Sequence, residues 1–211
     1  MTRRLILKMS MSLDGFVGGP NGEIDWLFRS MDAEATAWTV ETLWRAGAHL
    51  MGGRTFRDMA AFWPTSAEPF AAPMNEIPKV VFSRGGAAAA GTTQALTDAR
   101  ARAGAAAVPA SAAEGNWATA RLATGDLADE IARCKREPGR DLLAHGGASF
   151  AQSLVERGLV DEYRLLVHPV VLGRGLPLFA RLAAPADLAL VEARTFPGGA
   201  IAHVYRTRSA A

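Results

Sequence analysis

Strand-like and helix-like segments alternate along almost all of this 211-residue chain, and this alternation limits the possible folds more than any other feature. Short apolar runs predict strands at 4–10, 48–52, 78–83, 117–122, 141–145 and 160–173. Helical periodicity predicts helices at 33–47, 54–62, 126–136 and 148–158. Strands that alternate with helices are typical of an α/β fold with a mostly parallel central sheet.

The C-terminal part departs from this alternation. Segments 188–196 and 200–208 both have strand patterns and are joined by Pro197-Gly198-Gly199, which predicts a C-terminal antiparallel hairpin. The sequence predicts a single domain over 1–211, with one alanine-rich insertion at about 85–115.

Two local expectations concern packing and loops. Ala37, Val40, Leu43 and Trp44 lie on one face of the 33–47 helix, which predicts that this face is buried. Segment 64–77 is rich in proline, which predicts a loop between the second helix and the next strand.

Composition excludes several functional classes. The net charge is +2 and the basic residues are scattered, so nucleic-acid binding is not predicted. No apolar run reaches the roughly 18 residues that cross a membrane, so a cytoplasmic protein is predicted. Cys134 is the only cysteine, and the four histidines lack the spacing of metal ligands, so neither a disulfide nor a metal site is predicted.

Two glycine pairs, Gly52-Gly53 and Gly146-Gly147, each follow a predicted strand and begin a predicted helix. A helix N-terminus offers unpaired N–H groups and a partial positive charge, and glycine lets an anion approach the backbone. Ligands of α/β sheets bind at the carboxyl ends of the strands. The two pairs therefore predict two phosphate sites, as for a dinucleotide, while a tight strand-to-helix turn remains the structural alternative.

A third anion site is predicted at Ser83-Arg84, directly after a strand. A hydroxyl and a guanidinium suit a phosphate monoester, which in a dinucleotide would be the 2′-phosphate of NADPH. An exposed arginine after a strand is the structural alternative.

Four segments resemble the dihydrofolate reductase-like superfamily: SLDGFVGGPNGEIDW, LMGGRTFRDMAAFWP, MNEIPKVVFSR and DLLAHGGASFAQSLVERGLVDEYRLLVHPVVLGRGLPLF. They are most similar to the C-terminal reductase domain of the bifunctional riboflavin-biosynthesis deaminase/reductase and its stand-alone relatives. The resemblance implies a dihydrofolate reductase-like three-layer fold, NADPH as cofactor and a small-molecule substrate. It also implies a homodimer, for which the strand LLVHPVVLG is a candidate contact.

The resemblance also implies residue roles. The cofactor would be bound by Gly52, Gly53, Arg54, Thr55, Ser83, Arg84, Gly146, Gly147, Ala148 and Ser149. The loop 12–26 would close as a lid over the nicotinamide and the substrate, with its glycines as hinges. Phe16, Val17 and Trp26 would supply the apolar cover.

The sequence leaves the proton donor open. Asp32 has the spacing nearest to the superfamily's acid, with Asp25 and Glu34 as alternatives, but Asp32 would also serve as a helix N-cap. Asp14 and His145 are further candidates. Their structural alternatives are an Asx-turn and a histidine bonded to backbone.

Two positions depart from the riboflavin-pathway reductases, which usually have a basic residue at Phe16 and a glutamate at His145. The predicted function is an NADPH-dependent reductase of a small pyrimidine- or pterin-like heterocycle, similar to 5-amino-6-(5-phosphoribosylamino)uracil reductase. A dihydrofolate reductase, a non-catalytic NADPH-binding module and an interaction protein that uses the insertion are the alternatives.

Overall fold

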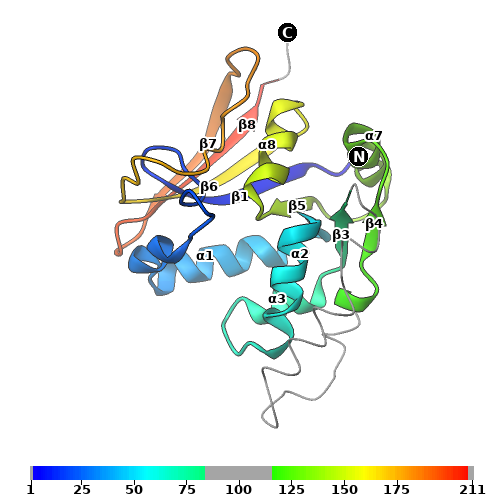
Figure 1. Ribbon diagram of the computed structural model, residues 1–211, viewed down its shortest axis with the longest axis horizontal. Helices are drawn as coiled ribbons and strands as arrows, with labels where there is room; N and C mark the ends of the chain where they lie inside the picture. The colour runs from blue at the N-terminus through cyan, green and yellow to red at the C-terminus, as the bar shows by residue number, and fades with distance from the viewer. Residues whose placement is uncertain (1, 84–115, 209–211) are drawn as a thin grey trace. The chain divides into compact units, whose positions relative to one another are not determined.

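A computed structural model describes residues 2–83 and 116–208, in which eight strands form one sheet of order β4-β3-β2-β5-β1-β6-β8-β7 (Figure 1). The pairs β1–β6, β2–β3 and β3–β4 are parallel, whereas β6–β8 and β7–β8 are antiparallel. The predicted α/β fold with a mostly parallel sheet and a C-terminal antiparallel hairpin is therefore confirmed. The strands are β1 (Leu5–Ser12), β2 (Ala48–Gly52), β3 (Lys79–Phe82), β4 (Arg121–Ala123), β5 (Leu142–His145), β6 (Glu162–His168), β7 (Leu188–Thr195) and β8 (Ile201–Thr207).

The four predicted helices are present close to their predicted positions. The helix that begins at Leu127 shows how the sequence sets a helix start. The side chain of Asp126 accepts the N–H of Ala128 and so caps this helix. None of the helices in the described part of the chain combines the length and apolar character needed to cross a membrane. The helices are α1 (Ala33–Trp44), α2 (Gly53–Ala60), α3 (Ala71–Glu76), α7 (Leu127–Arg136) and α8 (Ala148–Glu156), with 3-10 segments η1 (Asp25–Ser30) and η2 (Trp63–Thr65).

The protein divides into two compact units. Unit 1 comprises Met1–Arg3 and Val40–Leu143, and unit 2 comprises Arg4–Thr39 and Ala144–Ala211. The single domain over 1–211 stays a prediction. The predicted insertion at 85–115 lies outside the described residues.

The interior of unit 1 contains a buried cation beside an aromatic pair. Trp117 and Phe56 are fully buried, with ring centroids 5.5 Å apart. The Lys79 ammonium lies 4.5 Å from the centroid of the Trp117 ring and donates to the carbonyls of Asn75 and Ile77. Burial lowers the pKa of Lys79 to about 7. These carbonyls and the ring occupy the ammonium, so Lys79 serves the fold of unit 1.

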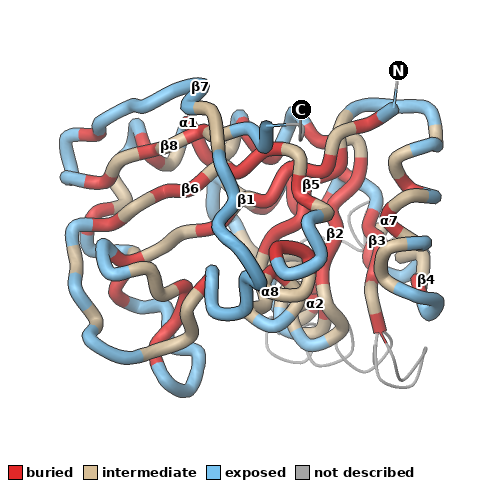
Figure 2. Tube along the Cα trace, turned by 90° about the horizontal axis from the view of Figure 1, so that it is seen from above, coloured by how far each residue is buried: buried red, intermediate tan, exposed pale blue. Residues whose placement is uncertain are grey.

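Unit 2 holds the antiparallel end of the sheet. Leu166 of β6 packs with Ala202 and Val204 of β8 and with Trp38 of α1 in one apolar cluster. β7 is the edge strand and is exposed along most of its length (Figure 2). Its pairing with β8 shifts register between Leu190 and Glu192, which marks a β-bulge.

The predicted buried face of the first helix was only partly right, because Leu43 is buried and Val40 is half-buried. Ala37 and Trp44 are exposed, whereas Ala35, Trp38 and Thr42 are buried. The buried residues of α1 thus include small and polar side chains, which hydrophobicity alone does not select.

Three element boundaries also differ from the predictions. Segment 64–77 contains η2 and α3, because proline is accepted in the first turn of a helix. The strand predicted at 160–173 ends at His168, because Pro169 has no N–H to continue the ladder. Only Arg121–Ala123 of the strand predicted at 117–122 is extended.

Candidate functional site

In unit 1, the first glycine pair forms an uncapped helix start. Gly52 ends β2 and is the N-cap of α2, with extended backbone angles of φ −74° and ψ 156° and no side-chain cap. Gly53, Arg54 and Thr55 form the first turn, with Arg54 exposed. The first N–H groups of α2 therefore have no side-chain acceptor and can receive an anion.

The predicted 2′-phosphate site lies at the end of β3. Ser83 is the residue that follows this strand, and its backbone N–H donates to the carbonyl of Ala123 at 3.2 Å. Arg84 lies outside the described residues.

In unit 2, the second glycine pair has a backbone that other residues rarely adopt. Gly146 and Gly147 follow β5 with φ values of 72° and 70°. This left-handed region is accessible to glycine at little cost. Gly147 is the N-cap of α8 and provides no side-chain cap, so the N–H groups at Ala148 and Ser149 begin the helix without a side-chain acceptor. This turn is suited to an anion, as the sequence predicts.

Asp14 fastens the predicted lid loop to the segment that follows β6. Its carboxylate accepts the Ser12 hydroxyl at 2.7 Å and the backbone N–H groups of Leu172 and Gly173 at 3.1 and 2.7 Å. These hydrogen bonds, above all the one from Ser12, lower the pKa of Asp14. A carboxylate stabilised in its ionised form is a poor proton donor, so the contacts favour a structural role for Asp14.

Backbone pairing holds the first half of the same loop. The N–H of Val17 donates to the carbonyl of Leu176 at 2.8 Å, and the N–H of Leu176 donates to the carbonyl of Gly18 at 2.8 Å. Phe16 forms a β-bridge with Pro177. The expected hinged lid over 12–26 is thus partly a paired segment. The hydrogen bonds of residues 19–23 are local, such as the one from the Gly19 N–H to the Glu23 carbonyl.

We expect Gly175→Ala to loosen this pairing. A Cβ at Gly175 would lie 2.3 Å from the carbonyl oxygen of Gly18, so the two backbones would have to separate. Amide hydrogen exchange at Val17 and Leu176 should become faster. Val171→Ala, at a 65% exposed position of the same segment, is the control that should leave exchange unchanged. Unchanged exchange in Gly175→Ala would contradict the close packing described here.

Asp32 caps α1 with one carboxylate oxygen and binds the turn between β7 and β8 with the other. One oxygen accepts the N–H of Ala35 at 2.8 Å, and the other accepts the N–H of Gly198. These bonds lower the pKa of Asp32. The contacts therefore favour the role of a helix N-cap for Asp32 over that of a proton donor.

His145, the third predicted proton donor, ends β5 directly before the glycine pair of unit 2. Its side chain is buried, with 6% exposure. Its position at the carboxyl end of a strand keeps it among the candidate residues.

Two polar groups of unit 2 were missed in the sequence and lie on one face of the sheet. Lys8 and Ser12 are four residues apart in β1 and therefore share one face of the sheet, and β1 pairs in register with β6 so that Ser12 lies opposite His168. Burial alone lowers the pKa of Lys8 to about 8. An acid that titrates near neutral pH suits proton transfer. The sequence signal was a lysine inside an otherwise apolar strand.

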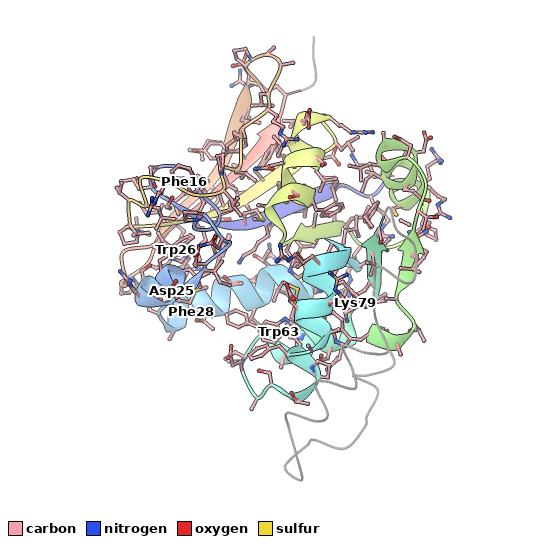
Figure 3. All side chains as sticks on the ribbon, viewed as in Figure 1. Phe16, Asp25, Trp26, Phe28, Trp63 and Lys79 are labelled. Atoms are coloured by element: carbon pink, nitrogen blue, oxygen red, sulfur yellow. The ribbon has the colours of Figure 1, made fainter. Side chains whose placement is uncertain are left out.

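His168 is fully buried at the end of β6. Its Nδ1 lies 2.8 Å from the hydroxyl of Ser30, and its ring meets the Trp26 ring edge-on with centroids 5.5 Å apart. Burial, and then the charge of Lys8, lower the pKa of His168 to about 4, so the imidazole is neutral at physiological pH. Both of its neighbours, Trp26 and Ser30, belong to η1 (Figure 3 labels Trp26).

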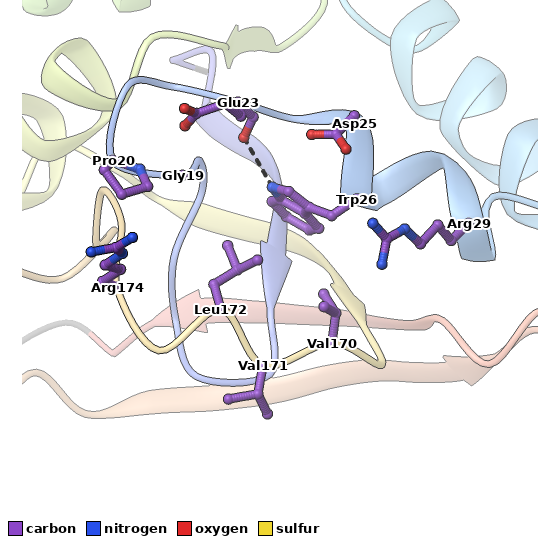
Figure 4. Close-up of a pocket in the computed structure, with 10 residues that line it drawn as sticks. All are labelled: Gly19, Pro20, Glu23, Asp25, Trp26, Arg29, Val170, Val171, Leu172 and Arg174. Carbon is purple, nitrogen blue, oxygen red and sulfur yellow. Dashed lines mark hydrogen bonds between the residues drawn. The ribbon is translucent and has the colours of Figure 1, made fainter.

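An open pocket of about 340 Å³ adjoins the same loop in unit 2 (Figure 4). Trp26 and the aliphatic side chains of 170–172 form its apolar part, and its charged groups have both signs. The Trp26 indole N–H donates to the Glu23 carbonyl at 3.0 Å, and this bond holds the ring in the wall of the pocket. The lining residues are Gly19, Pro20, Glu23, Asp25, Trp26, Arg29, Val170, Val171, Leu172 and Arg174.

The described part of the chain contains no candidate metal site. Among residues 2–83 and 116–208, no group of three or more His, Cys, Asp and Glu side chains is arranged to hold a metal ion.

The mostly parallel sheet with its C-terminal antiparallel pair defines a mixed α/β class of fold, and comparison with known proteins gives the family. The model of the RibD C-terminal domain family matches residues 3–202. The chain therefore belongs to this family, which is the reductase domain of RibD, and the predicted resemblance is confirmed.

Individual relatives agree with this assignment. The uncharacterized protein YyaP of Bacillus subtilis (strain 168) is 31% identical over 210 residues, covering 96% of this chain and 94% of YyaP. A pyrimidine reductase-like protein from Corynebacterium diphtheriae has a similar fold, with a TM-score of 0.61 and 14% identity over 99% of this chain and 93% of that one.

A longer protein also shares the fold. The diaminohydroxyphosphoribosylaminopyrimidine deaminase/5-amino-6-(5-phosphoribosylamino)uracil reductase of Thermotoga maritima matches with a TM-score of 0.60 and 14% identity. The match covers 98% of this chain and 57% of that chain. At this identity the likeness concerns the fold alone.

Proposed function

We propose that this protein is an NADPH-dependent reductase of a small pyrimidine- or pterin-like heterocycle, similar in reaction to 5-amino-6-(5-phosphoribosylamino)uracil reductase. The observation that carries the proposal is the uncapped turn at Gly146-Gly147, at the end of a buried strand in a RibD C-terminal domain. NADPH would supply the hydride. A dihydrofolate reductase would need a different acid, because the Asp32 carboxylate is occupied by two backbone N–H groups.

Each unit contains its own candidate cofactor-binding residues. In unit 1 they are Gly52, Gly53, Arg54, Thr55, Ser83 and Arg84, and in unit 2 they are Val17, Gly146, Gly147, Ala148 and Ser149. Helix N-termini without side-chain caps suit phosphate oxygens, which accept hydrogen bonds from several N–H groups at once.

Lys8 is the proposed proton source. Reduction of a C=N or C=O group requires a proton as well as a hydride, and the contacts of Asp14 and Asp32 hold both carboxylates in the ionised form. Lys8 is a half-buried cation, and loss of contact with water lowers its pKa to about 8. A proton can therefore leave this ammonium at modest cost.

Fluorescence titration with NADPH and with NADH tests the proposal. Trp26 in unit 2 and Trp63 in unit 1 are reporters on the intact chain (both labelled in Figure 3). We expect saturable binding with a preference for NADPH of about tenfold or more, as for one charge-assisted hydrogen bond to the extra phosphate. Equal affinity for NADPH and NADH would contradict the proposed 2′-phosphate site. An absence of binding of both nucleotides would refute the proposed function.

A non-catalytic NADPH-binding module is the second candidate. The engagement of Asp14 and Asp32 by backbone N–H groups favours it, because both predicted acids are unsuited to proton donation. Consumption of NADPH with 5-amino-6-(5-phosphoribosylamino)uracil separates the two, because a module would bind the cofactor without turnover. The homodimer stays a proposal, and within LLVHPVVLG the side chain of Val171 is exposed for such a contact.

A further inference from the structure

We propose that His168 is a substrate-contacting residue of this reductase, whose Nε2–H donates a hydrogen bond to a ring carbonyl oxygen of an oxopyrimidine when the segment Asp25–Ser30 lifts. The inference rests on the proposed function and adds to it a specificity-determining residue. Its starting point is one atom: His168 Nε2 is buried and has no hydrogen-bond partner among the described residues.

The Ser30 hydroxyl decides which ring nitrogen carries the proton. Ser30 is buried, and its hydroxyl has one partner among the described residues, His168 Nδ1 at 2.8 Å. If Nδ1 donated, both the hydroxyl hydrogen and the Nε2 lone pair would be unsatisfied. If the hydroxyl donates to Nδ1, only the Nε2–H is unsatisfied. The second arrangement leaves fewer buried polar groups unpaired, so Nε2 is the donor.

A buried donor without an acceptor favours any state in which it finds one. Trp26 and Ser30 of η1 cover His168, and the Ser30–His168 hydrogen bond ties the end of η1 to the sheet. η1 is a short 3-10 segment without a side-chain cap, and its Phe28 is 62% exposed. Lifting η1 breaks a single side-chain hydrogen bond to His168 and opens Nε2–H to a ligand.

The surrounding charge selects the chemistry of that ligand. Lys8 lies on the same face of the sheet and acts electrostatically on His168. Both groups are hydrogen-bond donors, and Ser12, the nearest serine in register, already bonds Asp14 and the N–H of Phe16. This face thus presents two donors, the Lys8 ammonium and the His168 Nε2–H. It favours carbonyl oxygens and disfavours amino groups, which would face two donors.

Two ligands and two variants test this proposal on the full-length protein without turnover. 5,6-Diaminouracil carries two ring carbonyl oxygens, and 2,4,5,6-tetraaminopyrimidine carries amino groups in their place. His168→Asn keeps an acceptor for Ser30 and loses the Nε2 donor, whereas His168→Gln places an amide N–H near the Nε2 position. Dissociation constants are measured by titration calorimetry in the presence of NADP⁺ under anaerobic conditions.

We expect saturable binding of 5,6-diaminouracil and no saturable binding of tetraaminopyrimidine. His168→Asn should weaken diaminouracil about tenfold, as for one lost hydrogen bond, and His168→Gln should restore most of the affinity. Equal affinity of wild type and His168→Asn would overturn the inference, and so would an absence of diaminouracil binding. In both cases NADPH binding by the wild type would leave the proposed function standing, whereas loss of both would refute the two together.

A measurement on the wild type keeps the inference testable if the variants do not fold. In protein labelled with ¹⁵N-histidine, the assigned His168 ring should show a neutral Nε2–H tautomer. Its Nε2 signal should shift on addition of 5,6-diaminouracil and not of tetraaminopyrimidine. An Nδ1–H tautomer, or a signal that does not move, would contradict the proposal and indicate that His168 serves only to fasten η1.

Discussion

Replacing Lys8 by methionine is expected to reduce kcat for NADPH oxidation by about 10²- to 10⁴-fold, the range of general acid catalysis. Methionine keeps the approximate length and the apolar stem of the side chain and removes the ionisable ammonium group. NADPH affinity should change little, because the glycine turns that would bind the phosphates do not include this residue. The measurements are steady-state kinetics with 5-amino-6-(5-phosphoribosylamino)uracil and a separate cofactor titration.

The control for Lys8→Met is Lys8→Arg, which retains the positive charge but cannot release a proton near neutral pH. Its kcat should stay low if Lys8 is the acid and should recover if only charge matters. In the wild type the ammonium is the active form, and its pKa is lowered to about 8. The rate should therefore fall as the pH rises through about 8. A flat profile across this range would show that another group supplies the proton.

Gly147→Ala is expected to weaken NADPH binding by tenfold or more. Gly147 has a φ of 70°, and an alanine in this region costs about 1–2 kcal/mol, so the turn would relax away from its present shape. The added methyl group also stands where a phosphate would meet the start of α8. A direct titration of the variant with NADPH measures the change.

Gly158→Ala is the matched control at the other end of the same helix. Gly158 has a φ of 62°, and a Cβ there would meet nothing within 4 Å. The two variants should lose similar thermal stability, because the backbone strain is alike. Only Gly147→Ala should lose cofactor affinity, and a similar loss in Gly158→Ala would mean that general destabilisation explains the effect.

The fold was largely predictable because it depends on periodicity and on glycine. The alternation of apolar strands with helices and the hairpin at Pro197-Gly198-Gly199 are local patterns, and the structure follows them. The errors came from proline and from small residues. Pro169 ends β6 early, and the buried face of α1 uses Ala35 and Thr42, whose burial depends on contacts with distant strands.

The candidate site was less accessible to sequence reasoning. Glycine turns have a local signature, so their places at the starts of α2 and α8 were found. The sequence does not show which groups an acidic side chain will bind. Asp14 and Asp32 were expected near the chemistry, yet their oxygens bind backbone N–H groups that are far away in the sequence. Lys8 stands out in the sequence only as a lysine inside an apolar strand, and its lowered pKa depends on the fold around it.

The bulge in β7 bears on how this protein behaves at high concentration. β7 is the outermost strand on its side of the sheet, and two of its apolar side chains, Leu190 and Val191, are 60% and 47% exposed. A straight edge of this kind would offer a template on which other chains could add as strands. The register shift between Leu190 and Glu192 interrupts that template where the apolar residues lie. The bulge therefore guards the exposed edge against aggregation.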